Sequence, residues 1–97
     1  MPAELKIPPG ALTDKNSEEV VRAWAAHDGL QCSLDVHVWP DDKGIRWGIL
    51  LSDIARYVAD ALYLTKKLEK ERTLAQIRAV FNSELDKPTA EATGKFI

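Results

Sequence analysis

The stretch that decides the fold is Leu30–Leu51, LQCSLDVHVWPDDKGIRWGILL. It begins with strict alternation, which places one set of apolar side chains on one face of a strand. This set is Leu30, Cys32, Leu34, Val36 and Val38. After the turn-forming residues 40–44, a second alternation runs from Ile45 to Leu51. We therefore predict an antiparallel β-hairpin over residues 30–51.

The register of this hairpin follows from matching its two apolar faces, since a slip of one residue would turn a whole face away from the core. Matching them pairs Val38 with Ile45 and Val36 with Trp47. Trp39 then lies in the loop, outside the predicted ladder.

Three helices are predicted around the hairpin. The first covers residues 16–27, because Asn16 and Glu19 have the spacing of a capping box. The second covers residues 52–70, where apolar residues recur at helical spacing. The third opens at a second capping box that starts at Thr73, and it ends before Pro88.

These elements predict one α+β domain over residues 1–97, in the order α-β-β-α-α, with the hairpin packed against amphipathic helices. Residues 1–13 are rich in proline and form an extended arm, which can add an edge strand through its short alternation of apolar residues. Residues 89–97 form a loosely held tail unless Phe96 and Ile97 dock.

Composition excludes several classes of partner. The formal net charge of -2 gives no whole-molecule attraction to nucleic acid or to an anionic membrane. No apolar run is long enough to span a bilayer. The single cysteine, Cys32, can form no internal disulfide, which is typical of a reducing compartment. The expected location is the cytoplasm.

Metal binding and nucleophilic catalysis are not supported by the pattern. His27, Cys32 and His37 are evenly spaced, but Cys32 and His37 point to opposite faces of the predicted strand. Neither histidine has an evident carboxylate to orient it. The adjacent acids Asp41 and Asp42 are typical of turn geometry. We predict no catalytic residue, no metal and no cofactor.

The predicted interaction residues are aromatic or lie beside an aromatic residue: Trp39, Pro40 and Tyr57. An exposed tryptophan in a loop is typical of a contact site with another protein or with a sister subunit.

The segment Glu84–Glu91 resembles the lipoyl-attachment motif of 2-oxoacid dehydrogenase acyltransferases, and the matching lysine is Lys87. Two features depart from that motif. Pro88 replaces the usual small residue, and a predicted helix precedes Asp86 where a lipoyl domain has a strand entering a hairpin.

Taken whole, the chain resembles an uncharacterised family of small bacterial proteins known only as a domain of unknown function. The resemblance rests on residues 29–34, 47–56 and 81–85 with Pro88 and Thr89. It implies a bacterial origin and transfers no activity and no site residues.

Three hypotheses follow. The first is a non-enzymatic accessory or interaction domain that self-associates as a dimer, because a two-stranded hairpin is marginal alone. The second is a small-ligand-binding or enzymatic domain, which a cavity lined by Tyr57, Trp47 and a buried charge would favour. The third is a link to a 2-oxoacid (pyruvate) dehydrogenase complex through Lys87.

Overall fold

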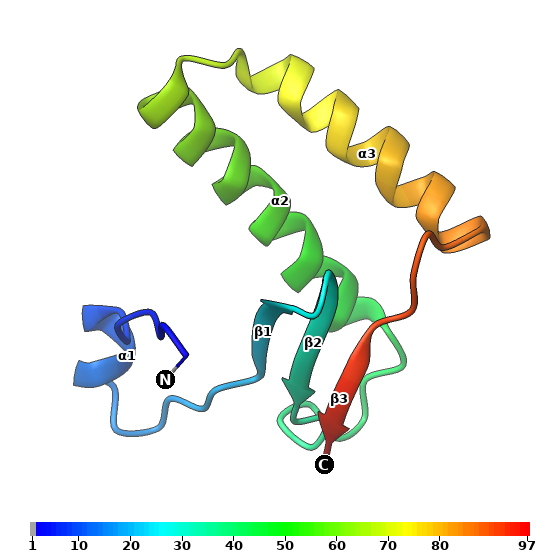
Figure 1. The fold of residues 1–97 in the computed structure, drawn as a ribbon. Helices are drawn as coiled ribbons and strands as arrows, with labels where there is room; N and C mark the ends of the chain where they lie inside the picture. The colour runs from blue at the N-terminus through cyan, green and yellow to red at the C-terminus, as the bar shows by residue number, and fades with distance from the viewer. Residues whose placement is uncertain (1) are drawn as a thin grey trace. The chain divides into compact units, whose positions relative to one another are not determined.

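The computed structural model describes residues 2–97 (Figure 1). Their elements follow in the order α1 (Pro9–Thr13), β1 (Val21–Ala26), β2 (Gly29–Leu34), α2 (Ile45–Lys66), α3 (Lys70–Asp86) and β3 (Thr93–Phe96). The α+β class, with a hairpin and amphipathic helices, is confirmed. The elements follow the predicted order α-β-β-α-α, but the first helix and both hairpin strands have other bounds than predicted, and a third strand follows the last helix. The chain forms two compact units, one with the residues up to Val38 and Ala92–Ile97, the other with Trp39–Glu91.

The β-hairpin lies earlier in the chain than predicted. β1 and β2 pair antiparallel from Val21 opposite Leu34 to Ala26 opposite Gly29. The two residues between them, His27 and Asp28, both have positive φ angles, 51° and 60°. Such a pair matches the type I′ turn, whose twist suits a tight hairpin.

The predicted helix over residues 16–27 is therefore wrong, because its second half is strand β1. Glu19 does not close a capping box either. Its carboxylate accepts hydrogen bonds from the Arg22 side chain at 3.1 and 3.2 Å. The apolar pairs at 20–21 and 24–25 fit a helix or a strand equally well, so the pairing with β2 decides between them.

The third strand comes from the C-terminal segment. β3 lies beside β2 in parallel, in the sheet order β1-β2-β3. The prediction of a loosely held tail over residues 89–97 is thus wrong for Thr93–Phe96. Residues 2–13 of the arm contain no strand, and the end of the arm forms the short helix α1, with proline in its first turn.

Helix α2 overturns the second strand of the predicted hairpin. Residues 45–51 are its first two turns, so the predicted pairs Val38–Ile45 and Val36–Trp47 do not form. The helix begins seven residues before the predicted start at Ser52. It ends at Lys66, where Lys67 adopts a left-handed φ of 59°. Within residues 2–97, no helix is both long and apolar enough to cross a membrane.

Helix α3 runs antiparallel beside α2 (Figure 1). It begins one turn before the predicted capping box. The Thr73 hydroxyl donates to the carbonyl of Glu69 at 3.0 Å and caps nothing. The helix ends at Asp86, before Pro88, as predicted. Among the described residues, the one fully buried apolar side chain is Ala59 of α2, at 1% exposure.

Candidate interaction site

The site begins with a tight turn before α2. The backbone N–H of Asp42 donates to the carbonyl of Trp39 at 3.1 Å, which closes a four-residue turn. Pro40 occupies the second position of this turn, where its fixed φ is favourable. The turn thereby sets the position of Trp39 relative to the start of the helix.

Asp42 holds the first turn of α2. Its Oδ1 accepts from the backbone N–H of Arg46 at 2.8 Å, and its Oδ2 accepts from Gly44 at 3.0 Å and from Trp47 at 3.4 Å. These bonds lower the pKa of the Asp42 carboxyl, and the bond from the Arg46 N–H has the largest effect. The predicted turn role of Asp42 thus takes the form of a helix cap.

The charge of Asp42 gives a pH-dependent contribution to stability. Because its pKa is lower in the folded state, the contribution is complete above the ordinary aspartate pKa of about 4 and is lost as the pH falls through the lowered pKa. We expect Asp42→Asn, which keeps a capping oxygen, to show a shallower loss of stability below about pH 4. Urea midpoints between pH 7 and pH 2 measure this.

The matched control for that experiment is Asp41→Asn. It removes the same charge from the same turn, but Asp41 accepts none of the three bonds. This variant should keep the acid dependence of the wild type. Identical acid slopes for Asp42→Asn and the wild type would contradict the role given to the Asp42 charge.

Trp39 lies against Trp47 rather than projecting from a loop. The two ring centroids are 5.3 Å apart and the planes meet at 75°, an edge-to-face contact. Both tryptophans are half-buried, whereas Pro40 is exposed. Tyr57 is 78% exposed and lies ten residues beyond Trp47, about 15 Å along the helix axis. The structure therefore brings together Trp39 and Trp47 but not Tyr57.

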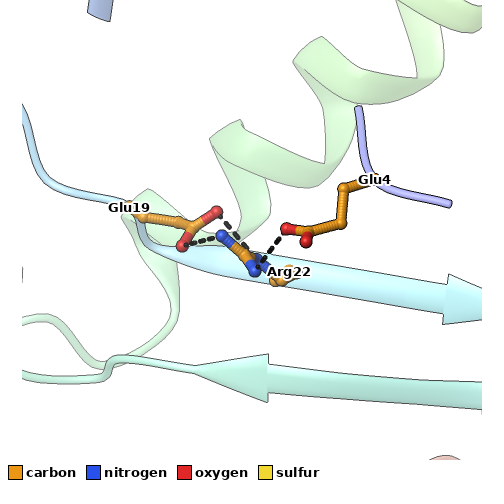
Figure 2. A network of polar contacts seen from close by, with 3 residues as sticks. All are labelled: Glu4, Glu19 and Arg22. Atoms are coloured by element: carbon orange, nitrogen blue, oxygen red, sulfur yellow. Dashed lines mark hydrogen bonds and ion pairs between the residues drawn. The ribbon is translucent and has the colours of Figure 1, made fainter. Parts of the chain in front are cut away.

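A second candidate surface lies between the N-terminal arm and β1. A groove of about 660 Å³ is bounded by residues 3–8 of the arm and by residues 20–24. Figure 2 shows the Arg22 guanidinium between the carboxylates of Glu4 and Glu19, with Nη1 to Glu4 Oε2 at 3.2 Å. All three side chains are about half-exposed, so these ion pairs tether the arm with little gain in stability. Sequence reasoning missed Arg22.

The histidine and cysteine candidates lie as follows. Cys32 is half-buried in β2, while His37 lies three residues beyond the end of the strand. The backbone N–H of His37 donates to Asp35 Oδ1 at 2.9 Å. His27 occupies the hairpin turn. Residues 2–97 contain no group of three His, Cys, Asp or Glu side chains placed to hold a metal ion.

Lys87 lies directly after α3, not at the tip of a β-hairpin. Glu84 closes the turn around it, because Thr89 donates its backbone N–H to Glu84 Oε1 at 3.0 Å and its hydroxyl to Oε2 at 2.8 Å. These two bonds lower the pKa of the Glu84 carboxyl, and the bond from the Thr89 backbone N–H has the larger effect. The acidic residue of the lipoyl-like segment therefore has a structural role here.

Comparison with protein families matches residues 4–89 to the family described as Domain of unknown function (DUF5076). The chain belongs to this family. The resemblance to a domain of unknown function that its sequence indicated is thereby confirmed. Comparison of this DUF5076 chain with curated proteins gives no match.

One solved structure is similar to the DUF5076 chain over almost its full length. It comes from the photosynthetic bacterium Rhodopseudomonas palustrus CGA009 and is named, provisionally, a pyruvate dehydrogenase. It shares 29% sequence identity, and the match covers 96% of this chain and 93% of that one with a TM-score of 0.72.

Proposed function

We propose that this chain is a non-enzymatic accessory domain of the bacterial cytoplasm that acts through protein contacts and self-associates as a homodimer. The observation that carries this proposal is the set of large apolar side chains that each of the two compact units leaves exposed.

The uncovered surface is apolar in both units. In the first unit, Leu5, Leu12 and Phe96 are at least 68% exposed. In the second unit, Ile45, Leu64 and Leu85 are at least 69% exposed. The exposed apolar residues of α2 include several that recur at helical spacing along one face of the helix. An exposed apolar face is typical of a contact site for another protein, so a protein partner is the physical expectation.

The oligomeric state tests this proposal. Sedimentation equilibrium at micromolar concentration should give twice the monomer mass of 10.8 kDa. Salt screens attraction between charges but does not weaken apolar contacts, so the dimer should persist in 1 M NaCl. A monomer at high micromolar concentration would overturn the proposal.

The small-ligand hypothesis lacks the observation that would favour it. Tyr57 is largely exposed, and the described residues include no buried polar or charged side chain. Trp47 contacts Trp39. These contacts and exposures favour the interaction hypothesis over small-ligand binding.

A second candidate function is a link to a pyruvate dehydrogenase complex, with Lys87 as a lipoylated residue. The observation that favours it is the provisional name of the solved structure, and the exposed side chain of Lys87 would be accessible to a ligase. The test is the intact mass of the chain after expression with lipoate and a lipoyl ligase, with Lys87→Arg as the control. An unchanged mass would remove this candidate.

A further inference from the structure

Helix α2 carries a line of residues whose spacing alternates between four and three. A hydrophobic repeat of 3.5 residues per turn is the pattern of a coiled-coil seam, in which side chains of two helices interlock. We call this line the α2 seam, and its members are Trp47, Leu51, Ile54, Val58, Ala61 and Thr65.

Apart from Trp47, which contacts Trp39, the members of the α2 seam lack a partner within their unit. Helix α3 is the element that packs on α2, and the most buried line of α2 is the neighbouring one, Ala55, Ala59 and Leu62. In the seam, by contrast, Leu51 is 48% exposed, Ile54 44% and Val58 40%. An apolar stripe therefore remains open beside the contact with α3.

The charges of α2 lie away from the seam. Asp53 forms an ion pair with Arg56 at 4.0 Å, and Asp60 forms one with Lys70 at 3.3 Å. At 100° per residue, Asp53, Arg56 and Asp60 fall on the side of α2 opposite the seam. A partner could cover the seam without removing a charge from water.

We propose that the α2 seam packs antiparallel against the α2 seam of a second copy, so that two α2–α3 hairpins form a four-helix bundle. This inference rests on the proposed self-association and names its surface. A second copy is the occupant because the seam is self-complementary in the antiparallel direction. A two-fold axis that crosses the seam at the height of position 56 places Leu51 opposite Ala61 of the second copy and Ile54 opposite Val58 of the second copy.

Each layer of the bundle then pairs a larger side chain with a smaller one. Leu51 meets alanine, Ile54 meets valine, and Trp47 meets Thr65 of the second copy. Interlocking of large and small residues is what close packing between helices requires. Tyr57 flanks the seam at the two-fold axis, so this predicted interaction residue would lie beside its own counterpart.

Disulfide cross-linking tests the antiparallel register. In a Cys32→Ser background, Ile54→Cys and Val58→Cys are made as separate proteins, mixed, re-equilibrated and oxidised. A covalent dimer should form in the mixture and in neither protein alone, because position 54 faces position 58 of the other copy. The control mixture is Arg56→Cys with Asp60→Cys, which has the same spacing on the solvent side and should stay uncross-linked.

A size exchange tests the packing of the Leu51–Ala61 layer. Leu51→Ala should raise the dissociation constant of the dimer about tenfold or more by leaving a void, and Ala61→Leu should do so by overpacking. The double variant restores one large and one small residue in each layer, so its dissociation constant should return to within about threefold of the wild type. Circular dichroism verifies that each variant stays helical.

The outcomes separate the two proposals. A monomeric wild type would remove both. A dimeric wild type without the mixture-dependent cross-link, or without rescue in the double variant, would remove the seam and leave self-association standing. A cross-link in Ile54→Cys alone would indicate a parallel arrangement and would also overturn the inference.

Discussion

Replacing Ala59 with aspartate is expected to disrupt the packing of α2 on α3 and to lower the melting temperature by at least ~10 °C. Ala59 is 1% exposed and lies in α2, on which α3 packs. An aspartate there is both too large and charged, and an unpaired buried charge costs several kcal/mol. A chain of 97 residues has only about 5–15 kcal/mol of stability in total. Thermal unfolding followed by circular dichroism measures the change.

The control for this variant is Ala75→Asp. It makes the same substitution within a helix of the same unit, but at an exposed position of α3. Its cost should be within about 1 kcal/mol, since only helix propensity changes. Equal melting temperatures for the two variants would show that Ala59 does not hold the helices together.

Some elements could be predicted from the sequence because one local pattern determines them. Strand β2 follows from strict alternation over residues 30–34, with Gly29 at its start. The end of α3 follows from Pro88, which cannot continue a helix. In both cases no competing structure fits the same residues.

The start of α2 differs from the prediction because residues 45–51 fit both the period of a strand and that of a helix. Ile45, Trp47, Ile49 and Leu51 alternate as in a strand. Trp47 and Leu51 are also four residues apart, and this spacing is the first step of the α2 seam. The helical period can therefore be told from that of a strand over the whole of α2 but not over its first seven residues alone. The three bonds to the Asp42 carboxylate then fix the helix start. The alternation of apolar residues over positions 45–51 contains no information about these hydrogen bonds.

The candidate site was only partly accessible from sequence. The hairpin register that predicts a loop at Trp39 does not form, yet Trp39 does lie outside the observed ladder. Its contact with Trp47 depends on the turn at Pro40 and on the helix start together. The exposure of Tyr57 depends on which side of α2 is covered by α3. Both are properties of packing, which no local spacing encodes.

Strand β3 leads to the second large expected effect, because its place depends on a single glycine. Gly94 has a φ of 144°, and a Cβ at this position would overlap the backbone carbonyl of Cys32. Gly94→Ala should therefore detach β3 from β2, since the backbone angle alone costs about 1–3 kcal/mol for other residues. Two backbone hydrogen bonds report on the pairing. The N–H of Ile97 donates to the carbonyl of Leu34 at 2.9 Å, and the N–H of Val36 donates to the carbonyl of Ile97 at 3.2 Å.

Amide hydrogen exchange at Ile97 and Val36 measures this detachment, and both amides should exchange at least about tenfold faster in Gly94→Ala. The control is Gly48→Ala in α2, where an added Cβ meets nothing within 4 Å. That substitution should stabilise the helix by about 0.5–1 kcal/mol and leave the two amides unchanged. The two glycine variants are thus expected to act with opposite signs. If Gly94→Ala left the exchange rates of Ile97 and Val36 unaltered, β3 would not depend on the close approach of its backbone to Cys32.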